Sequence, residues 1–410
     1  MAGSGSTEES KETATTNLQR QQQELAKQKE LTESESNCYR MWWDQVSLYS
    51  NKMRTYFNYK KIPYKFMQNT FASAMGEIPE LVGMQIMPVV LTPDNKVMQD
   101  STPMMEWFEQ EYPERAAIPE DDRLAWIMWL LEEFSDEGLP RPAMRTRWGT
   151  EESSQSLSHQ IARGMGYGSS ADEVKAVARM INDRQSGFDK VLALNTDEEK
   201  ESVDKQLAEL LAILEKHFHT YSYLLGDRPS LADFAFYGPL GAHMFKDAVS
   251  RMMLETTAPM VCRWLDELDQ LGDTRGGLGR EAFGDWLSVD DGIPETLLAL
   301  IGFIARTFLP ISFGYVDAML KCEKFFKVTV DGVESSFKRM DYRAGTFAIL
   351  QRRYIDLPDE TKLWLSDVLA ETGILPGLIT RGVYPNPAFE KLTPPFITDP
   401  EANRIAYKGK

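Results

Sequence analysis

The sequence predicts an α/β domain with a mixed sheet, followed by a long and almost entirely helical region. Strand-like and helix-like stretches alternate between residues 38 and 112, which is typical of an α/β sandwich. Beyond Pro119 the apolar residues recur at helical spacing. The chain has 410 residues, 42% of them apolar, so two or three domains with hydrophobic cores are expected.

Composition and charge exclude several classes of function. The net charge of −17 argues against the clustered basic surface that binds nucleic acid. Cys38, Cys262 and Cys322 lie far apart without CxxC spacing, so neither a disulfide framework nor a zinc site is indicated. His217 and His219 have no third ligand near them in the sequence. We therefore expect a protein without a bound metal in a reducing, cytoplasmic compartment.

No targeting or membrane segment is expected. The first residues contain neither the basic region nor the apolar run of a secretory signal. The most apolar stretch, residues 297–311, is interrupted by Gly302, Arg306 and Pro310 and is shorter than the ~18 apolar residues of a membrane span. We expect this stretch to form a buried helix followed by a turn.

Residues 1–36 are polar, rich in Gln, Glu, Ser, Thr and Lys, and almost free of large apolar side chains. Such a composition buries too little apolar surface to fold, so a disordered tail is expected. The alternative is a helix over residues 17–31 that binds a partner.

The α/β domain is expected over residues 37–118. Its most distinctive part is Met87-Pro88, where a strand is entered through an X-Pro bond. Proline cannot donate to a sheet ladder, and a cis bond here would expose a main-chain N–H and C=O at the sheet edge. Asp100 and Ser101 then open a helix, where free N–H groups favour an anion. These residues predict a small polar cradle for a peptide-like ligand. The other elements expected in this domain are strands at 39–43 and 64–67 and from residue 97, helices at 51–59 and 102–112, and a loop or short helix at 70–84.

An all-α domain is expected over residues 119–280, and a mostly helical extension packed on it over residues 281–410. The glycine-rich residues 273–279 mark the boundary between them. Ser230 and Asp233 have the spacing of a capping box, which is a structural role. The expected helices are 124–133, 171–194, 203–218, 234–248, 258–271, 294–309, 314–320 and 359–371, with a short hairpin at 325–333.

Four motifs occur in the order and at the separations of one enzyme family. Residues 47–54 and the following Lys61-Ile62-Pro63-Tyr64 are similar to its strand–hydroxyl–helix opening and its G-I-P-Y motif, with Lys61 in place of glycine. Met87-Pro88-Val89 matches V-P-V, and Asp100-Ser101 matches E-S. Residues 226–233 match the signature G-x-x-x-S-x-A-D. Over residues 38–270 the chain thus resembles the glutathione S-transferases.

This resemblance implies a thioredoxin-like N-terminal domain that binds glutathione, followed by an all-α glutathione transferase C-terminal domain. The extension resembles that of a long subgroup of transferase-like proteins. Family members commonly form dimers, so a homodimer is expected unless the extension blocks it.

The resemblance places the residue that activates the thiol at Ser47. The thiolate of glutathione is the nucleophile, and a hydroxyl at a helix N-terminus stabilises it by a hydrogen bond and by the helix dipole. Tyr49 is the alternative hydroxyl, because some members use tyrosine. The purely structural alternative is that Ser47 caps the helix that follows it.

The rest of the glutathione site is also implied by the resemblance. The main chain of Met87, next to Pro88, would pair with the cysteinyl backbone in the manner of strand addition. The Asp100 carboxylate would meet the γ-glutamyl α-ammonium, and Ser101 the α-carboxylate.

The glycyl end of the site departs from the family pattern. Gln or Lys often stands two residues before the proline to bind the glycyl carboxylate, but here that residue is Ile86. Gln85 and Lys52 are candidates to compensate, and both are also plausible surface residues.

An acidic pair at residues 136–137 precedes Arg141, Arg145 and Arg147. These side chains either line the cleft for the second substrate or form an internal salt-bridge set between two helices.

The function that the sequence predicts is attack of glutathione, as co-substrate, on an apolar electrophile held by the helical domain. The alternative is a non-catalytic scaffold or complex subunit that kept the fold. Ile86, the extension and the polar tail favour that alternative. The identity of the electrophile is not indicated.

Overall fold

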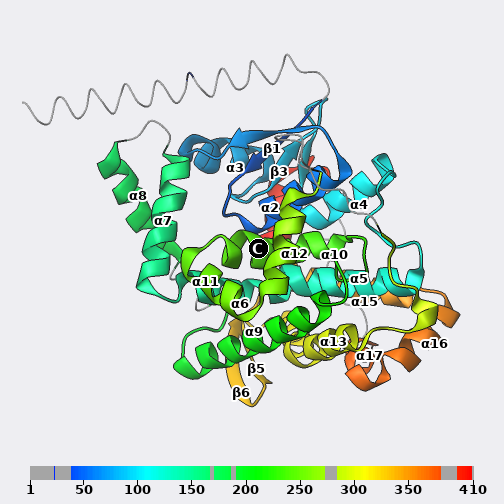
Figure 1. Ribbon diagram of the computed structural model, residues 1–410. Helices are drawn as coiled ribbons and strands as arrows, with labels where there is room; N and C mark the ends of the chain where they lie inside the picture. The colour runs from blue at the N-terminus through cyan, green and yellow to red at the C-terminus, as the bar shows by residue number, and fades with distance from the viewer. Residues whose placement is uncertain are drawn as a thin grey trace, which may run out of the picture.

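The computed structural model describes residues 23, 38–166, 170–185, 191–272, 284–379 and 395–408. The predicted polar tail lies outside the described residues except for Gln23, and so do the glycine-rich boundary and residues 380–394 of the proline-rich end. The α/β domain lies on one side of a large assembly of helices (Figure 1).

The α/β domain is built on a four-stranded mixed sheet, as the sequence predicts, and the strand order is β2-β1-β3-β4. The central strand β1 is parallel to β2 and antiparallel to β3, and β3 is antiparallel to β4. The elements are β1 (Tyr39–Trp43), α2 (Leu48–Lys60), β2 (Tyr64–Gln68), η1 (Ser73–Glu77), α3 (Ile78–Val82), β3 (Val89–Leu91), β4 (Val97–Gln99) and α4 (Ser101–Glu111).

Alternate residues of β1 face opposite sides of the sheet, as the two-residue period of a strand requires. Met41 is buried in the main core with Phe57 of α2 and Phe108 of α4. Trp42 packs on the other side in a smaller core that includes Val82 of α3. The sheet is therefore covered by helices on both faces.

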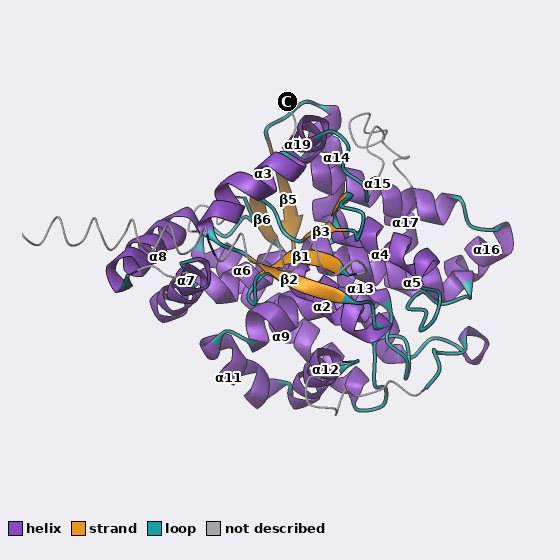
Figure 2. Cartoon of the chain, turned by 90° about the horizontal axis from the view of Figure 1, so that it is seen from above, coloured by secondary structure: helices purple, strands orange, loops and turns teal. Residues whose placement is uncertain are grey.

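The helical domain differs from the prediction in two places. The helix predicted over residues 171–194 ends at Gln185 in the described chain, and residues 191–193 form a turn. Three helices, α6, α7 and α11, were not predicted, and α7 and α8 project from the body of the molecule (Figures 1 and 2). The capping box is present, with the Ser230 N–H donating to the Asp233 carboxylate at 2.8 Å. The elements are α5 (Asp122–Glu133), η2 (Phe134–Gly138), α6 (Pro140–Trp148), α7 (Glu151–Met165), α8 (Ala171–Gln185), α9 (Asp197–Phe218), α10 (Leu231–Phe236), η4 (Tyr237–Phe245), α11 (Ala248–Thr257) and α12 (Pro259–Gln270).

The extension contains the predicted hairpin and several further helices. The turn predicted after the first apolar helix lies at Phe308, and α14 begins at Leu309. Pro310 falls in the first turn of α14, where a missing N–H leaves no bond unmade. The elements are η5 (Val289–Asp291), α13 (Glu295–Thr307), α14 (Leu309–Leu320), β5 (Phe325–Val330), β6 (Val333–Lys338), α15 (Asp341–Ile355), α16 (Asp359–Val368), η6 (Ala370–Thr372), α17 (Ile374–Ile379) and α19 (Pro400–Lys408).

The stretch Glu295–Leu320, which joins α13 and α14, is the one place in the described chain where length and composition would suffice to cross a membrane. Half of its most apolar window is buried inside the protein. Leu300 and Ile304 belong to the main core, and α13 packs against α9. The inner face of this stretch is therefore buried in the core, as the sequence predicts.

The C-terminal segment returns to the sheet and covers its edge. The Gln99 N–H of β4 donates to the Pro395 carbonyl at 2.9 Å, and the Ile397 N–H donates to the Val97 carbonyl at 2.9 Å. Helix α19 then packs against α3 and α15 (Figure 2). The buried Asn403 donates to the Val82 carbonyl at 2.7 Å. An edge that would otherwise offer unpaired main-chain groups is thus closed by the chain itself.

Candidate functional site

Ser47 is the residue immediately before α2, with an extended backbone of φ −81° and ψ 127°. Its hydroxyl makes no capping bond, although helix N-caps commonly do. The helix begins three residues earlier than predicted, so Ser47 lies directly at its N-terminus. A hydroxyl in this position, with no partner in the described chain, is free to donate to an anion.

Met87 lies between two cavities of about 490 Å3 each, and it contributes to the walls of both. The Met87–Pro88 bond is cis, as predicted. Neither the N–H nor the C=O of Met87 forms a hydrogen bond within the described residues. The peptide group before Pro88 is therefore available to an extended ligand.

We name the first cavity the Ser47 cavity. It lies between the α/β domain and the helical domain, and Ser47, Gln85 and Met87 line one side of it. Polar residues, among them Asp44, Arg147 and Arg184, line other parts of it. Methionines and isoleucines contribute much of the apolar wall, and methionine adapts its shape to irregular apolar partners. These apolar residues are Met75, Ile78, Ile86, Met144, Ile161, Met165, Met180 and Ile181.

We name the second cavity the Asp100 cavity. Asp100, Ser101 and Pro88 line it together with Tyr342 and Tyr407 from the extension. The Asp100 carboxylate accepts hydrogen bonds from the Tyr342 hydroxyl at 2.9 Å and from the Tyr407 hydroxyl at 2.6 Å. The carboxylate expected to meet a γ-glutamyl ammonium is thus already held by two phenols.

Asp100 also has an unusual backbone, with φ 76° and ψ 115°. Non-glycine residues at positive φ cost free energy and cluster at functional sites. Burial raises the pKa of its carboxyl, while the hydrogen bonds from Tyr407 and Tyr342 oppose that rise. Ser101 follows as the first residue of α4 and is buried.

The remaining predicted site residues have partners elsewhere. Tyr49 is turned to the Asp100 cavity, and its hydroxyl donates to the Asp136 carbonyl at 2.8 Å. The Gln85 side chain accepts from Arg184 at 2.9 Å. Lys52 is fully buried and pairs with Glu132 at 2.5 Å and Asp136 at 2.6 Å. It is therefore not positioned to bind a glycyl carboxylate.

Lys52 lies at the centre of an acidic cluster, which we define as Glu132, Glu133, Asp136 and Glu137. All four are buried, on α5 and on the π-helical segment η2. Burial raises the pKa of Glu133 and Asp136 well above usual values, and it raises the pKa of Glu137 to about 7. Burial alone would lower the pKa of Lys52, but Asp136 and Glu132 raise it above its usual value.

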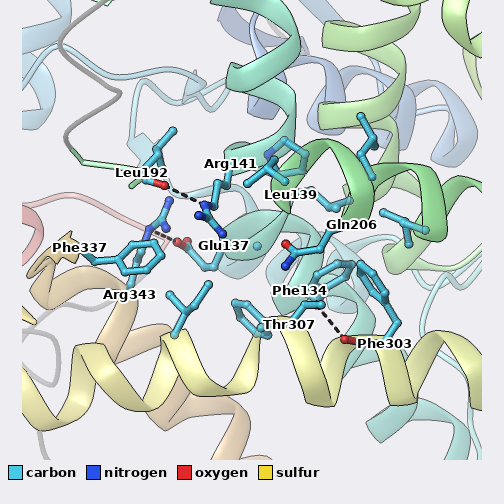
Figure 3. Close-up of a pocket in the computed structure, with 17 residues that line it drawn as sticks. Phe134, Glu137, Leu139, Arg141, Leu192, Gln206, Phe303, Thr307, Phe337 and Arg343 are labelled. Atoms are coloured by element: carbon cyan, nitrogen blue, oxygen red, sulfur yellow. Dashed lines mark hydrogen bonds and ion pairs between the residues drawn. The ribbon is translucent and has the colours of Figure 1, made fainter. Parts of the chain in front are cut away.

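The arginines near the acidic pair do not bind it. Arg141 donates to the Leu192 carbonyl at 2.9 Å, and Glu137 pairs instead with Arg343 of the extension at 2.9 Å (Figure 3). Arg145 pairs with Asp204 of α9, and Arg147 pairs with Asp247, the residue before α11. The predicted internal salt-bridge set between acidic pair and arginines is therefore wrong, because each group finds a partner that is distant in the sequence.

Sequence reasoning missed three residues that line the cavities. Tyr342 and Tyr407 reach Asp100 from segments 242 and 307 residues away, and no local pattern signals such contacts. His243, on the π-helical segment η4, lines both cavities, and its Nδ1 has no partner among the described residues. Burial and then Arg147 lower the pKa of His243 well below its usual value, so the ring is neutral.

Two family models match the chain. The N-terminal domain of glutathione S-transferases matches residues 44–116, and their C-terminal domain matches residues 174–271. No curated protein matches the sequence.

Solved structures of several transferases are similar to this chain. A beta-etherase from Sphingobium sp. strain SYK-6 is 17% identical, with a TM-score of 0.43, over 57% of this chain and 95% of the etherase. A glutathione S-transferase from Methylobacterium radiotolerans in complex with glutathione sulfonate is 17% identical, with a TM-score of 0.37, over 62% of this chain and 100% of that one. A glutathione transferase from Phanerochaete chrysosporium is 14% identical, with a TM-score of 0.40, over 57% and 96%.

The two matched domains occur in the family's order, and the sheet order, the cis bond before Pro88 and the capping box agree with the motifs that suggested the resemblance. Helices beyond residue 284 extend the helical domain. The chain therefore carries the two domains of the glutathione S-transferase-like superfamily over residues 44–116 and 174–271, with a thioredoxin-like N-terminal fold, an all-α C-terminal fold and a helical extension.

Proposed function

We propose that this protein binds glutathione along the peptide group of Met87 and promotes the attack of the glutathione thiol on an apolar electrophile. The observation that carries the proposal is the free main chain of Met87, which lies between the Ser47 and Asp100 cavities. An extended peptide pairs with such a group by main-chain hydrogen bonds.

Ser47 would stabilise the thiolate in this arrangement. Its hydroxyl has no capping bond to give up, and the N-terminus of the 13-residue helix α2 adds a favourable dipole. The thiol loses its proton to solvent, its sulfur forms a bond to the electrophilic carbon, and the leaving group departs with the electron pair. The Ser47 cavity, with its methionines, would hold the electrophile beside the sulfur.

Ser101 and the N-terminus of α4 would receive the α-carboxylate of the γ-glutamyl group.

The second candidate function, a non-catalytic scaffold, is favoured by a specific observation: Tyr342 and Tyr407 already satisfy the Asp100 carboxylate. A transferase with this arrangement must bind the γ-glutamyl ammonium beside the phenols or displace them.

Two measurements on the full chain separate these functions: glutathione binding by calorimetry, and conjugation of glutathione to 1-chloro-2,4-dinitrobenzene. Ser47→Ala should leave binding nearly intact and lower turnover, since each unit by which the thiol pKa rises removes about 90% of the thiolate. Tyr49→Phe is the matched control, because its hydroxyl is bound to a backbone carbonyl. It should keep its turnover.

Absence of glutathione binding to the wild-type protein would overturn the proposal. Binding without turnover would favour the scaffold. Loss of turnover in Tyr49→Phe but not in Ser47→Ala would move the activating role to Tyr49. Assembly as a homodimer and a cytoplasmic location stay predictions, and the first is tested by measuring the mass in solution.

A further inference from the structure

A third cavity, of about 260 Å3, lies beside the Asp100 cavity and is lined by an unusual number of acidic groups. We name it the acidic cavity. Its walls come from α4, α5, η2, α15 and α19. The residues that line it with carboxyl groups are Asp100, Glu106, Glu132, Glu133, Asp136 and Glu137.

These six carboxyl groups contact only three cations in the described chain. Lys52 pairs with Glu132 and Asp136. Arg343 pairs with Glu137, and Arg353 pairs with Glu106. The cavity therefore has more carboxyl groups than cations to pair with them.

The imbalance is concentrated at two residues. Glu133 has no cation within ion-pair distance among the described residues, and its carboxylate receives one hydrogen bond, from Thr346 at 2.9 Å. One oxygen of Asp136 is bound by Lys52, while the other, Oδ1, is buried and has no partner in the described chain. Glu133 and Asp136 are each only 7% exposed. Glu133 is the last residue of α5 and Asp136 lies in the π-helical segment that follows it, and both line the acidic cavity.

The other walls are apolar, from Pro103, Trp129, Ile349 and Leu350, and Ile349 is 41% exposed, so the cavity is accessible from solvent. No group of three or more metal-ligating side chains in the described part of the chain is arranged to hold a metal ion. Apolar walls with two carboxylates suit a cation that carries an alkyl chain.

We propose that the acidic cavity binds a primary alkylammonium ion, with the ammonium group between Glu133 and Asp136 and the alkyl chain against the apolar walls. A charged donor satisfies both carboxylates with strong hydrogen bonds. The raised pKa of Glu133 agrees with this, because a buried carboxyl without a cation retains its proton and a bound cation releases it.

The ammonium group could belong to a free amine or to the γ-glutamyl group of glutathione. Met87, Pro88 and Ser101 line the Asp100 cavity but not the acidic cavity. The residues that line both are Asp100, Asp136, Glu137, Tyr342 and Tyr407. Glu133 lines the acidic cavity alone, apart from the residues proposed to hold glutathione. We assign the acidic cavity to a separate amine.

The test is isothermal titration calorimetry on the full chain with n-butylamine and 1,4-diaminobutane, with n-butanol as the neutral control ligand. One amine should bind per chain, n-butanol should not bind, and the enthalpy should differ between two buffers because protons are released. Glu133→Gln should weaken binding about tenfold or more, the loss of one charged hydrogen bond. Glu334→Gln, on the exposed hairpin, is the matched control and should bind amine normally.

Glu133→Gln is the decisive variant, because Asp136→Asn also removes a partner of Lys52. No amine binding to the wild-type protein, or equal binding to Glu133→Gln, would overturn the proposal. Displacement of the amine by glutathione, but not by glutathione lacking its amino group, would assign the site to the γ-glutamyl ammonium and overturn a separate amine. Displacement by calcium at the same ionic strength would overturn the choice of an amine over a metal.

Discussion

Two groups of charged residues are buried in this molecule, and they are balanced in different ways. Arg147 binds Asp247 through two hydrogen bonds, at 2.6 and 3.0 Å, and its remaining donors reach the carbonyls of Val46 and Ala242. Each charge in this pair has a full set of partners. The acidic cluster has four carboxyl groups, and Lys52 and Arg343 are its partner cations.

This difference in pairing distinguishes buried charges that stabilise the fold from buried charges that bind a ligand or a proton. Buried charge that is fully paired holds elements together, and here the pair joins α6 to the residue before α11. Buried charge in excess costs stability and is retained where a ligand or a proton compensates for it. At Asp100 the hydroxyls of Tyr342 and Tyr407 stabilise the carboxylate by hydrogen bonds, but these neutral groups do not supply positive charge.

The largest expected effect comes from breaking the balanced pair. Asp247→Asn leaves Arg147 buried without its counter-charge and should lower the free energy of unfolding by about 3–5 kcal/mol. Urea unfolding measures this. Asp204→Asn, which breaks the more exposed pair with Arg145, is the control and should cost below about 1 kcal/mol. Equal costs in the two variants would remove the distinction between the pairs.

In the acidic cluster, removal of a carboxyl group should raise the free energy of unfolding instead of lowering it. Burial holds the pKa of Glu133 in the folded protein above its unfolded value, so its stabilising contribution is complete below about pH 4.3 and is lost as pH rises through the folded pKa. Glu133→Gln should therefore raise the free energy of unfolding at pH 8, by about 1–3 kcal/mol, and change it little at pH 4.5.

The same linkage gives the wild-type protein a pH dependence. Because burial raises the pKa of Glu137 to about 7, stability should fall between about pH 4.3 and pH 7 through this residue. Urea unfolding across this range measures the slope, which Glu137→Gln should reduce. An exposed control, Glu334→Gln, should leave it unchanged. For the preceding prediction, a gain in the free energy of unfolding of Glu133→Gln that is independent of pH would contradict the raised pKa of Glu133.

A smaller effect is expected from the phenols. Tyr407→Phe removes one of two hydroxyl donors from the buried Asp100 carboxylate and should cost about 1–2 kcal/mol. Tyr112→Phe is the control, because its hydroxyl lies 3.5 Å from that of Tyr39 in a weak contact. Thermal unfolding compares the two. A cost no greater than that of the control would show that Tyr407 does not hold Asp100.

The smallest effect on stability is expected at Ser47. Its hydroxyl makes no capping bond, so Ser47→Ala should change the free energy of unfolding by less than about 0.5 kcal/mol. Thr196 is the matched cap, since its side chain accepts from the Glu199 N–H at 3.1 Å, and Thr196→Ala should cost about 1 kcal/mol. A loss at Ser47 as large as that at Thr196 would favour a capping role.

Much of the fold could be predicted because it depends on near neighbours in the sequence. The run of large side chains at residues 39–43 indicates a strand, and Ser230 with Asp233 marks a helix start. The candidate site was predictable where it rests on short motifs, as at Met87-Pro88 and Asp100-Ser101. Lys52 was not, because a lysine on a helix is usually exposed, and only packing shows that Glu132 and Asp136 surround it.

By itself the sequence determined the order of the elements in the α/β domain, the cis bond before Pro88 and the capping box at Ser230 and Asp233, since these depend on a few neighbouring residues. Only the tertiary structure decided that Tyr342 and Tyr407 cap Asp100 and that Glu133 and Asp136 remain short of positive charge. Those contacts join segments that are hundreds of residues apart. They depend on how the extension packs against the sheet, and no local pattern records that packing.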